Sequence, residues 1–361
     1  MRILHVITSL RTGGAEKLMV DLLPRLKEKG HQVDLCVFNG AKTPFYKQLL
    51  TENIRIIDFG ENNGVYSLGN IFQLRKLIKD YDIIHTHNTS PQLFAAISNL
   101  GVKRRLVTTE HNTTNRRRKW KGYAAVDRWM YHQYDRIISI SKKTEDNLRE
   151  YLGECRTSIC TINNGIDISK YADVGSSDYL ESLASGSRKL IMVAGFRPQK
   201  DQDTLMRSLL YLPSDFHLFL VGDGVRGEEL QHLAIENGLQ ERVHFLGVRT
   251  DVPNLLHAAD YVVMSSHWEG FGLAAVEGMA AGKPILASDV DGLREVVKGA
   301  GLLFKVGDAK ALSEEILKLE ADKDYYNKVA QACQQRARDF DISKMAEGYL
   351  KVYNSLQTVA Q

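Results

Sequence analysis

A chain of 361 residues exceeds the size of one typical domain, so two hydrophobic cores are expected. Its 43% hydrophobic and 25% charged residues are typical of a globular protein and exclude a disordered or fibrous chain. The net charge of +3 gives no general argument for nucleic acid as a partner.

The first half of the chain alternates short apolar runs with segments of helical length. The runs are nearly continuous in apolar residues, which favours a parallel sheet buried on both faces. Alternation of strand and helix predicts βαβ units and a doubly wound α/β sheet. The predicted strands cover residues 2–8, 32–38, 54–59, 83–87, 105–110, 136–141 and 159–163.

The pattern breaks over residues 169–188, which are rich in Ser, Gly and Asp and have no strand character. It then restarts, with strands predicted at 189–196, 216–224, 242–248, 261–265, 283–288 and 301–306. We therefore predict two Rossmann-like domains, over 1–170 and 186–340, with an amphipathic final helix in 341–361.

Polar residues follow several strands of the first half. Gly13 and Gly14 follow the first strand and open a helix, where backbone can approach a ligand closely. His85, His87 and Asn88 end one strand, and His111 follows another, so we expect both groups on the rim of the sheet. Three histidines could bind zinc, but no open-site carboxylate pattern accompanies them.

Two loops of the second half carry charge or glycine. Arg197 and Lys200 follow the strand over 189–196 and could stabilise a phosphate group. Gly222, Gly224 and Gly227 have the spacing of a dinucleotide fingerprint. No carboxylate ends the next strand to bind a ribose, so we interpret that loop as a tight turn.

The most informative segment runs from 265 to 290. Glu269 and Glu277 bracket Gly270, Phe271 and Gly272, between an apolar run and a helix-like run that begins at Leu273. The helix start offers free N–H groups to an anion, and Glu277 lies one turn into the helix, where its carboxylate can accept hydrogen bonds from a sugar diol. The segment therefore predicts a nucleotide-sugar site. Asp289 to Asp291 could suggest a metal, but no other carboxylates support one.

The pair Glu269 and Glu277, with its glycines, resembles the Glu-x7-Glu signature of retaining glycosyltransferases of family 4, which have the GT-B fold. The resemblance implies two Rossmann-like domains facing a central cleft, with the last helix crossing back to the first domain. It implies transfer of a sugar from a nucleotide-diphosphate sugar, such as a UDP-sugar, to a saccharide or a lipid-linked acceptor in polysaccharide or glycolipid synthesis. No metal and no further cofactor are expected.

The resemblance also implies roles for single residues. Arg197 and Lys200 match residues that bind the donor diphosphate, and His111 matches a histidine near the transferred sugar. Glu269 would bind sugar hydroxyls, Glu277 the ribose, and the segment near Arg249 the base. The helix start at Gly270 to Leu273 and the loop at Gly13 and Gly14 would face the diphosphate, while His85, His87 and Asn88 could line the acceptor side.

Residues 116–121 form a basic cluster around an aromatic residue, and Arg117 and Trp120 are candidate acceptor contacts. Such a cluster suits an anionic membrane surface or a phosphate-bearing lipid as well as it suits a solvated helix face. No nucleic-acid motif accompanies it.

The cysteines and the apolar runs bear on location. Four cysteines are scattered without metal-site spacing, which favours buried thiols in a reducing compartment. No secretory signal is evident, and no apolar run has the length that spans a bilayer. We expect a cytoplasmic protein. Any peripheral membrane contact would be with the inner face of the cell membrane.

Two other functions are compatible with these residues. A nucleotide-sugar epimerase of the same fold would use the same phosphate and ribose sites, with carboxylates placed for proton abstraction. A non-catalytic sugar-nucleotide or membrane-binding protein could keep the fold without turnover, although intact Arg197, Lys200, Glu269 and Glu277 speak against it.

Overall fold

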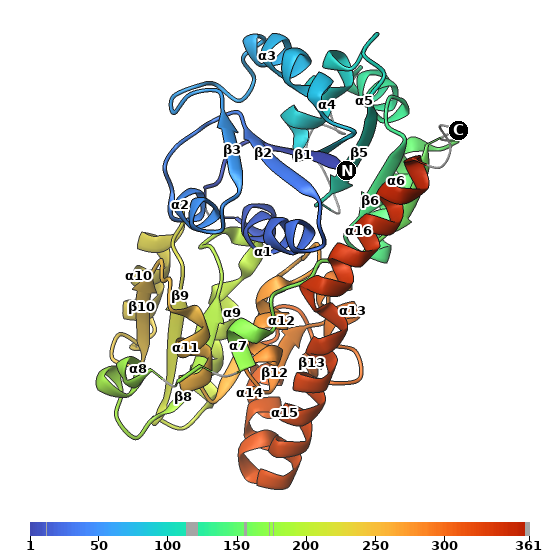
Figure 1. Cartoon of the computed structure of the whole chain (residues 1–361). Helices are drawn as coiled ribbons and strands as arrows, with labels where there is room; N and C mark the ends of the chain where they lie inside the picture. Colours follow the sequence, from blue (N-terminus) through green and yellow to red (C-terminus); the bar gives the residue numbers. More distant parts are fainter. Residues whose placement is uncertain (12, 113–121, 155–156, 173, 176, 358–361) are drawn as a thin grey trace. The chain divides into compact units, whose positions relative to one another are not determined.

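The computed structural model describes residues 1–11, 13–112, 122–154, 157–172, 174–175 and 177–357 (Figure 1). The chain divides into two compact units. Unit 1 consists of Met1–Gly165 with Ile342–Gln361, and unit 2 of Ile166–Asp341. Each unit has one parallel sheet with helices on both faces, which confirms the predicted α/β class.

Unit 1 contains a seven-stranded sheet in the order β3-β2-β1-β4-β5-β6-β7, with all neighbours parallel. Its strands are short, and the central ones are almost entirely buried, as their apolar composition predicted, whereas the edge strands β3 and β7 are more exposed. They are β1 (Arg2–Ile7), β2 (Gln32–Val37), β3 (Arg55–Asp58), β4 (Ile83–His87), β5 (Arg105–Glu110), β6 (Arg136–Ser139) and β7 (Ser158–Thr161).

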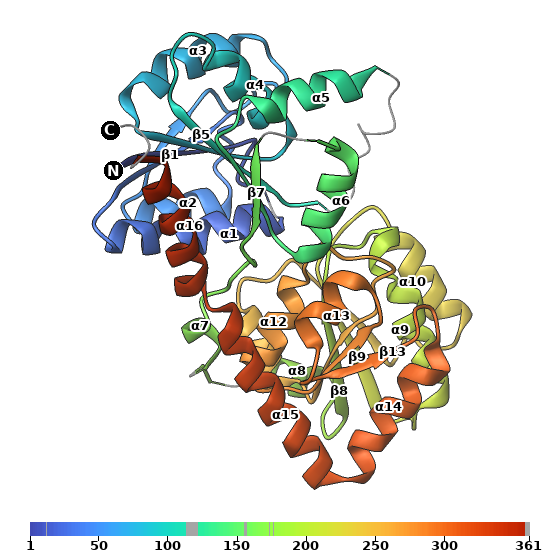
Figure 2. The same cartoon turned by 90° about the vertical axis from the view of Figure 1, so that its right-hand side faces the viewer.

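Two hydrophobic cores cover the two faces of this sheet. Helices α1, α2 and α16 pack on one face, and α3, α4, α5 and α6 contribute to the core on the other (Figure 2). The final helix α16 therefore belongs to unit 1. The helices are α1 (Gly14–Glu28), α2 (Pro44–Thr51), α3 (Gly69–Leu77), α4 (Thr89–Ser98), α5 (Tyr123–His132), α6 (Lys142–Leu152) and α16 (Ile342–Gln357).

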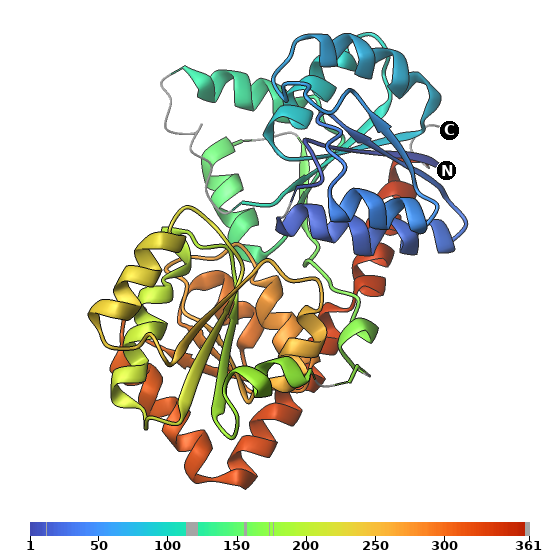
Figure 3. The same ribbon diagram turned by 90° about the vertical axis from the view of Figure 1, so that its left-hand side faces the viewer.

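Unit 2 contains a six-stranded parallel sheet in the order β10-β9-β8-β11-β12-β13. Its strands lie between helical layers (Figure 3). The strands are β8 (Arg188–Val193), β9 (Phe216–Val221), β10 (Val243–Gly247), β11 (Tyr261–Met264), β12 (Ile285–Ser288) and β13 (Leu302–Phe304). The helices are α7 (Ser169–Ala172), α8 (Asp178–Leu183), α9 (Gln202–Ser208), α10 (Gly227–Glu236), α11 (Val252–Ala258), α12 (Leu273–Ala280), α13 (Asp291–Val297), α14 (Ala309–Ala321) and α15 (Lys323–Ala337).

The strand order of each sheet reverses once, and this reversal locates the ligand-binding edge. In unit 1 the chain winds outward in opposite directions from β1 and β4, and in unit 2 from β8 and β11. Open α/β sheets bind ligands beyond the carboxyl ends of the strands at such a switch point. The loops after β1, β4, β8 and β11 are therefore the first places to look for a site.

All thirteen predicted strands are present in the described chain. The segment 169–188, expected to be an irregular joint, carries the short helices α7 and α8 instead. The first and last residues of unit 2, Ile166 and Asp341, form an isolated parallel bridge. In the part of the chain that the structure describes, no helix has the length and apolar character needed to cross a bilayer.

Candidate functional site

The loop after β8 is held in one conformation by the start of α9. Residues Pro198–Lys200 form a single 3-10 turn, and Asp201 follows in the left-handed region with φ of 48°. The Asp201 side chain accepts a hydrogen bond from the backbone N–H of Thr204 and so caps α9. This cap fixes the direction in which Arg197 and Lys200 leave the sheet.

The loop after β11 is tied to the loop after β8. The Ser265 hydroxyl donates to the carbonyl oxygen of Asp201 at 2.8 Å, and the backbone N–H of His267 donates to the carbonyl oxygen of Gln199 at 2.9 Å. These bonds hold the two loops together across the switch point. These bonds were not predicted, although a serine directly after a buried apolar strand is a signal for such a bond.

Lys200 and Glu269 form an ion pair between these loops. The lysine Nζ donates to both carboxylate oxygens, at 2.6 and 2.9 Å, and the two side chains are only 16% and 11% exposed. The prediction gave the two residues separate ligands, the diphosphate and the sugar. The structure brings them together, so each charge balances the other where solvent is scarce.

Arg197 is the exposed cation of the same loop. Within the described residues its guanidinium has no hydrogen-bonding or ionic partner. A guanidinium offers five donors in a planar fork that matches the oxygens of a phosphate. Arg197 is therefore available for an anionic ligand at the carboxyl edge of β8.

The turn before α12 has the geometry expected of an anion site. Gly272 caps the helix with φ of 92°, a conformation that side chains rarely adopt. Gly292 lies so close to this turn that an added Cβ would come within 2.5 Å of the Glu269 carbonyl oxygen. The first N–H groups of a helix have no acceptor inside it, and α12 directs them at this edge.

Side chains of the same segment have unequal surroundings. Glu277, one turn into α12, is 3% exposed. Phe271 is 4% exposed and packs edge-to-face on Phe340 at 5.3 Å. The Phe271 ring lies in the core, so the predicted contact of Phe271 with the donor would come from its backbone. Leu273 is the first residue of α12.

The glycine loop after β9 is a tight turn, as interpreted from the sequence. An added Cβ on Gly224 would lie 2.5 Å from the carbonyl oxygen of Phe196, so the turn packs directly on the loop after β8. A dinucleotide fingerprint belongs to the first strand of its fold, whereas β9 is the neighbour of β8 on the side away from the switch point.

Two charged groups of unit 2 are already paired. Arg249 binds Asp251 through two hydrogen bonds, at 2.9 and 2.7 Å, and its guanidinium lies 4.6 Å from the centre of the Tyr179 ring. Asp289 and Asp291 both accept from Arg294. The two aspartates therefore form an ion-pair cluster that begins α13 (residues 291–297).

The switch point of unit 1 is polar. Asn88, with φ of 69°, precedes α4 and donates to the Thr8 hydroxyl at 3.1 Å and to the Glu16 carboxylate at 3.4 Å. These bonds join the loops after β1 and β4. Gly13 caps α1 in extended conformation and Gly14 is its first residue, so the predicted glycine loop does lie at this edge.

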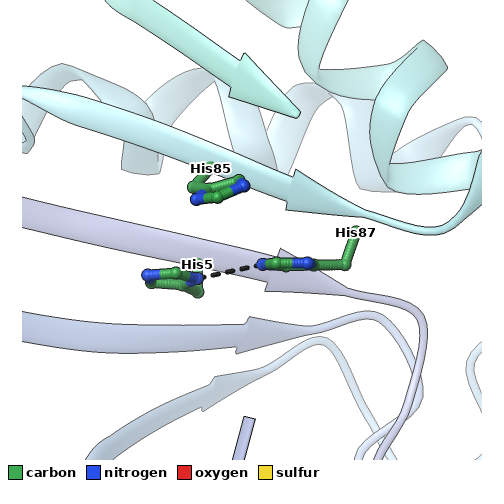
Figure 4. Close-up of side chains that lie close together, drawn as sticks. All are labelled: His5, His85 and His87. Atoms are coloured by element: carbon green, nitrogen blue, oxygen red, sulfur yellow. Dashed lines mark hydrogen bonds between the residues drawn. The ribbon is translucent and has the colours of Figure 1, made fainter. Parts of the chain in front are cut away.

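His5, His85 and His87 of unit 1 lie side by side, because the register places His5 beside His85 and alternate residues of a strand share a face (Figure 4). A fourth histidine, His111, contacts His87. His5 Nδ1 lies 3.0 Å from His87 Nε2, and His87 Nδ1 lies 2.9 Å from His111 Nε2. His5, His85 and His87 are fully buried, and only His111 reaches the surface. The predicted place of His85 and His87 on the rim is wrong, since both rings lie in the core.

Burial controls the charge of these histidines. Removal from water lowers the pKa of His5 from 6.5 to about 3 and that of His111 to about 4. It also holds the pKa of His85 and His87 well below the ordinary value, with smaller contributions from neighbouring histidines. All four rings are neutral at physiological pH.

Ring nitrogens of His5, His85 and His87 lie within 4.8 Å of one another, as in a metal site. Both His85 nitrogens, however, are engaged by the Tyr353 hydroxyl at 2.5 Å and the Thr109 hydroxyl at 2.8 Å. The His85 and His87 rings also stack, with centroids 4.5 Å apart, so their lone pairs do not converge. The geometry favours hydrogen bonding over zinc ligation.

A hollow of 380 Å³ at the carboxyl edge of unit 1 was not predicted. It lies beyond β1 and β2, and its lining is formed by Thr8, Ser9, Arg11, Asn39, Asn63 and Val65. The sequence signal was weak, because the residues come from separate loops. The predicted acceptor contacts Arg117 and Trp120 lie outside the described residues.

Comparison with known proteins identifies the family. Residues 12–170 match the model for Glycosyltransferase Family 4, and residues 181–339 match that for Glycosyl transferases group 1. An uncharacterized glycosyltransferase of Methanocaldococcus jannaschii is 27% identical over 95% of both chains. The Escherichia coli UDP-Gal:alpha-D-GlcNAc-diphosphoundecaprenol alpha-1,3-galactosyltransferase is 25% identical over 98% of this chain and 96% of its own.

Solved structures agree with the sequence relatives. Anabaena HepE in complex with UDP and glucose superposes with a TM-score of 0.88, at 25% identity, over 98% of this chain and all of HepE. Both halves of the chain, its relatives and its fold thus lead to the same group of enzymes. The protein belongs to glycosyltransferase family 4 and is a glycosyltransferase with the GT-B fold.

Proposed function

We propose that this enzyme is a retaining glycosyltransferase that moves a sugar from a UDP-sugar to a saccharide or lipid-linked acceptor. The observation that carries the proposal is the switch point of unit 2. There Arg197, the Lys200–Glu269 pair and the start of α12 meet beyond adjacent strands. Positive potential for a diphosphate lies beside a carboxylate that can accept from sugar hydroxyls.

Arg197, Lys200 and the N-terminus of α12 would stabilise the leaving group. During transfer, the bond between the anomeric carbon and the β-phosphate oxygen breaks, and its electron pair stays on UDP. The acceptor hydroxyl oxygen forms the new bond to that carbon, and its proton passes to the departing phosphate. The interaction of these fixed cations with the leaving diphosphate becomes stronger as negative charge develops on it, and this lowers the activation barrier of the transfer.

Retention of configuration is supported by the resemblance of Glu269 and Glu277 to the Glu-x7-Glu signature, and the state of Glu269 indicates which route to retention is open. A double displacement would require a carboxylate that attacks the anomeric carbon. Both oxygens of Glu269 accept hydrogen bonds from Lys200, which makes this carboxylate a poor nucleophile. We assign Glu269 to sugar hydroxyls and Glu277 to the ribose, and we assign attack from the same face to the acceptor hydroxyl.

The choice of UDP is supported by relatives. HepE has been solved with UDP and glucose, and the E. coli relative is named for a UDP-Gal donor. In this chain the paired Arg249 lies on the segment that follows β10, where we place the uracil. Its guanidinium is held by Asp251, so we expect backbone groups of this segment to read the base.

The acceptor is assigned to unit 1. The hollow beside Thr8 and Arg11 offers hydroxyl, amide and cationic groups, which suit a saccharide that carries phosphate. The E. coli relative is named for a diphosphoundecaprenol-linked sugar. Helix α5 exposes Val126 and Trp129, at 40% and 38%, immediately after the basic cluster, so we propose peripheral contact with the inner face of the membrane.

Calorimetric binding of UDP, GDP, ADP and CDP, with and without EDTA, tests the donor site. We expect UDP to bind most tightly, and Arg197→Gln to weaken it about 10-fold or more, because a charged hydrogen bond contributes roughly 1.5–3 kcal/mol. The control is Arg207→Gln, an exposed arginine in the last turn of α9, at the end of the helix away from the loop that carries Arg197. Equal UDP affinity in Arg197→Gln and wild type would overturn the site.

Product analysis separates the remaining alternatives. Incubation with UDP-galactose or UDP-glucose and a diphosphate-linked N-acetylglucosamine lipid should release UDP and lengthen the lipid-linked sugar. An epimerase would interconvert the two donors without release of UDP. A non-catalytic binding protein would bind UDP and leave both donors unchanged.

A further inference from the structure

The buried histidines of unit 1 are linked to the final helix by two tyrosines. Tyr353 and Tyr349, one turn apart on α16, are both fully buried. The Tyr353 hydroxyl bonds His85 Nδ1 at 2.5 Å and lies 3.5 Å from His5 Nε2. The Tyr349 hydroxyl bonds Thr109 at 2.9 Å. A line of polar contacts therefore runs from α16 to His111 along the sheet face that α16 covers.

The contacts permit only two proton arrangements while the rings are neutral. A neutral imidazole has one donor and one acceptor nitrogen. If His111 donates from Nε2 to His87, then His87 must donate from Nε2 to His5, and the Nε2 of His5 must face Tyr353 as a donor. In the reverse arrangement every one of these rings carries its proton on Nδ1. The tautomers are coupled because each bond fixes the next.

Tyr353 decides between these arrangements. A phenol is a better donor than acceptor, and an imidazole nitrogen is the better acceptor, so the short contact has Tyr353 donating to His85 Nδ1. The lone pairs of the phenolic oxygen then face His5 Nε2. An unprotonated nitrogen there would repel these lone pairs in a fully buried site, so His5 carries its proton on Nε2.

We propose that Tyr353 on α16 fixes one direction of proton donation through His5 and His87, so that His111 has its proton on Nε2 and a bare Nδ1 at the carboxyl edge of β5. Tyr353 is then a positioning residue, since it acts on His111 through two other rings. Within the described chain Nδ1 of His111 has no partner, so it can accept a hydrogen bond from a ligand hydroxyl.

The consequence for catalysis rests on the proposed function, in which His111 contacts the transferred sugar. A bare Nδ1 accepts a hydrogen bond from a sugar hydroxyl, whereas a protonated Nδ1 could only donate one to the hydroxyl oxygen, so the tautomer decides which way this bond runs. The low pKa of the buried rings supports this single direction of donation. A charged ring would donate from both nitrogens and could not accept a hydrogen bond from its neighbour.

Nitrogen NMR of the full-length enzyme labelled at histidine reads the tautomers directly. At pH 7.5 the wild type should show neutral Nε2–H tautomers for His5, His85, His87 and His111. In Tyr353→Phe, His5, His87 and His111 should change to mixed or Nδ1–H tautomers. The matched control is Tyr349→Phe, which removes an equally buried hydroxyl of the same helix that bonds Thr109 and no histidine.

The wild-type spectrum alone can overturn the proposal, if His111 shows an Nδ1–H tautomer or a charged ring. An unchanged His111 in Tyr353→Phe would overturn it as well. UDP release from UDP-glucose then tests the proposed function separately. If the tautomers change in Tyr353→Phe and the rate of UDP release does not, the proposed proton order is supported. The same result would contradict the contact of His111 with the sugar. A several-fold lower rate in Tyr353→Phe, with the rate of Tyr349→Phe unchanged, would support both.

Discussion

At the level of single residues, Lys200 and Glu269 each have two roles, to bind a ligand and to neutralise the other, and one charge cannot fill both at once. Each offers its charge to a ligand, yet in the free protein each neutralises the other at 2.6 Å. A carboxylate that is 11% exposed and loses its partner must either take up a proton or remain poorly solvated. The pair therefore stabilises the free site until a donor supplies other partners.

We expect Lys200→Met to destabilise unit 2 by about 2–3 kcal/mol and to weaken UDP binding, because it leaves Glu269 without its cation. Glu269→Gln in the same chain should restore part of the stability and none of the UDP affinity. Urea unfolding and calorimetry measure the two quantities. Full recovery of UDP affinity in the double variant would show that Lys200 does not contact the nucleotide.

A second prediction about a single residue concerns Gly292. A Cβ there would lie 2.5 Å from the Glu269 carbonyl oxygen, which is backbone and cannot move aside alone. Gly292→Ala should shift the turn before α12 and weaken UDP binding about 10-fold or more. Gly175→Ala is the control, because its Cβ would meet nothing within 4 Å in the same unit. Equal UDP affinity in both variants would contradict the role given to this turn.

At the level of elements, strand positions could be predicted from sequence because parallel strands buried on both faces are apolar along their whole length. The contacts between loops could not. Lys200 and Glu269 are 69 positions apart, and only the adjacency of β8 and β11 brings them together. His5 carried no signal, since it is one polar residue in an apolar strand, and its partners depend on the register of β1 with β4.

Helix α16 contributes to the core of unit 1 as much as any element of the first 165 residues. Met345 is 2% exposed in that core. Met345→Ala should lower the free energy of unfolding of unit 1 by about 2–4 kcal/mol, while the exposed Lys351→Ala on the same helix should leave it unchanged. Urea unfolding measures this free energy in a Trp268→Phe background, in which Trp129 reports on unit 1. An effect no larger than that of Lys351→Ala would contradict the packing of α16.

At the level of the whole molecule, the two units share a topology and differ in how they hold polar groups. Both strand orders reverse between the first and fourth strand of the unit, and both place polar side chains at that point. Unit 2 uses fixed, paired charges there. Unit 1 places neutral histidines beneath the corresponding edge, and among the described residues of unit 2 no histidine is fully buried.

This difference predicts that unit 1 is the more sensitive to acid. The pKa of His5 falls to about 3 and that of His111 to about 4 in the folded state, against 6.5 when exposed. Below pH 6.5 these histidines therefore bind protons in the unfolded chain and stay neutral in the folded unit. Stability is constant above pH 6.5 and falls as the pH is lowered toward 4, at about 1.4 kcal/mol per histidine for each pH unit.

At pH 5 His5 and His111 should each cost about 2 kcal/mol, a large share of the roughly 5–15 kcal/mol that stabilises a domain, and His85 and His87 act in the same direction. Urea unfolding at pH 7.5, 6 and 5 checks this, with Trp129 reporting on unit 1 in Trp268→Phe and Trp268 reporting on unit 2 in Trp120→Phe with Trp129→Phe. The midpoint of unit 1 should fall much further than that of unit 2. Equal falls would mean that the histidines take up protons in the folded state, and hence that water or a negative charge reaches them.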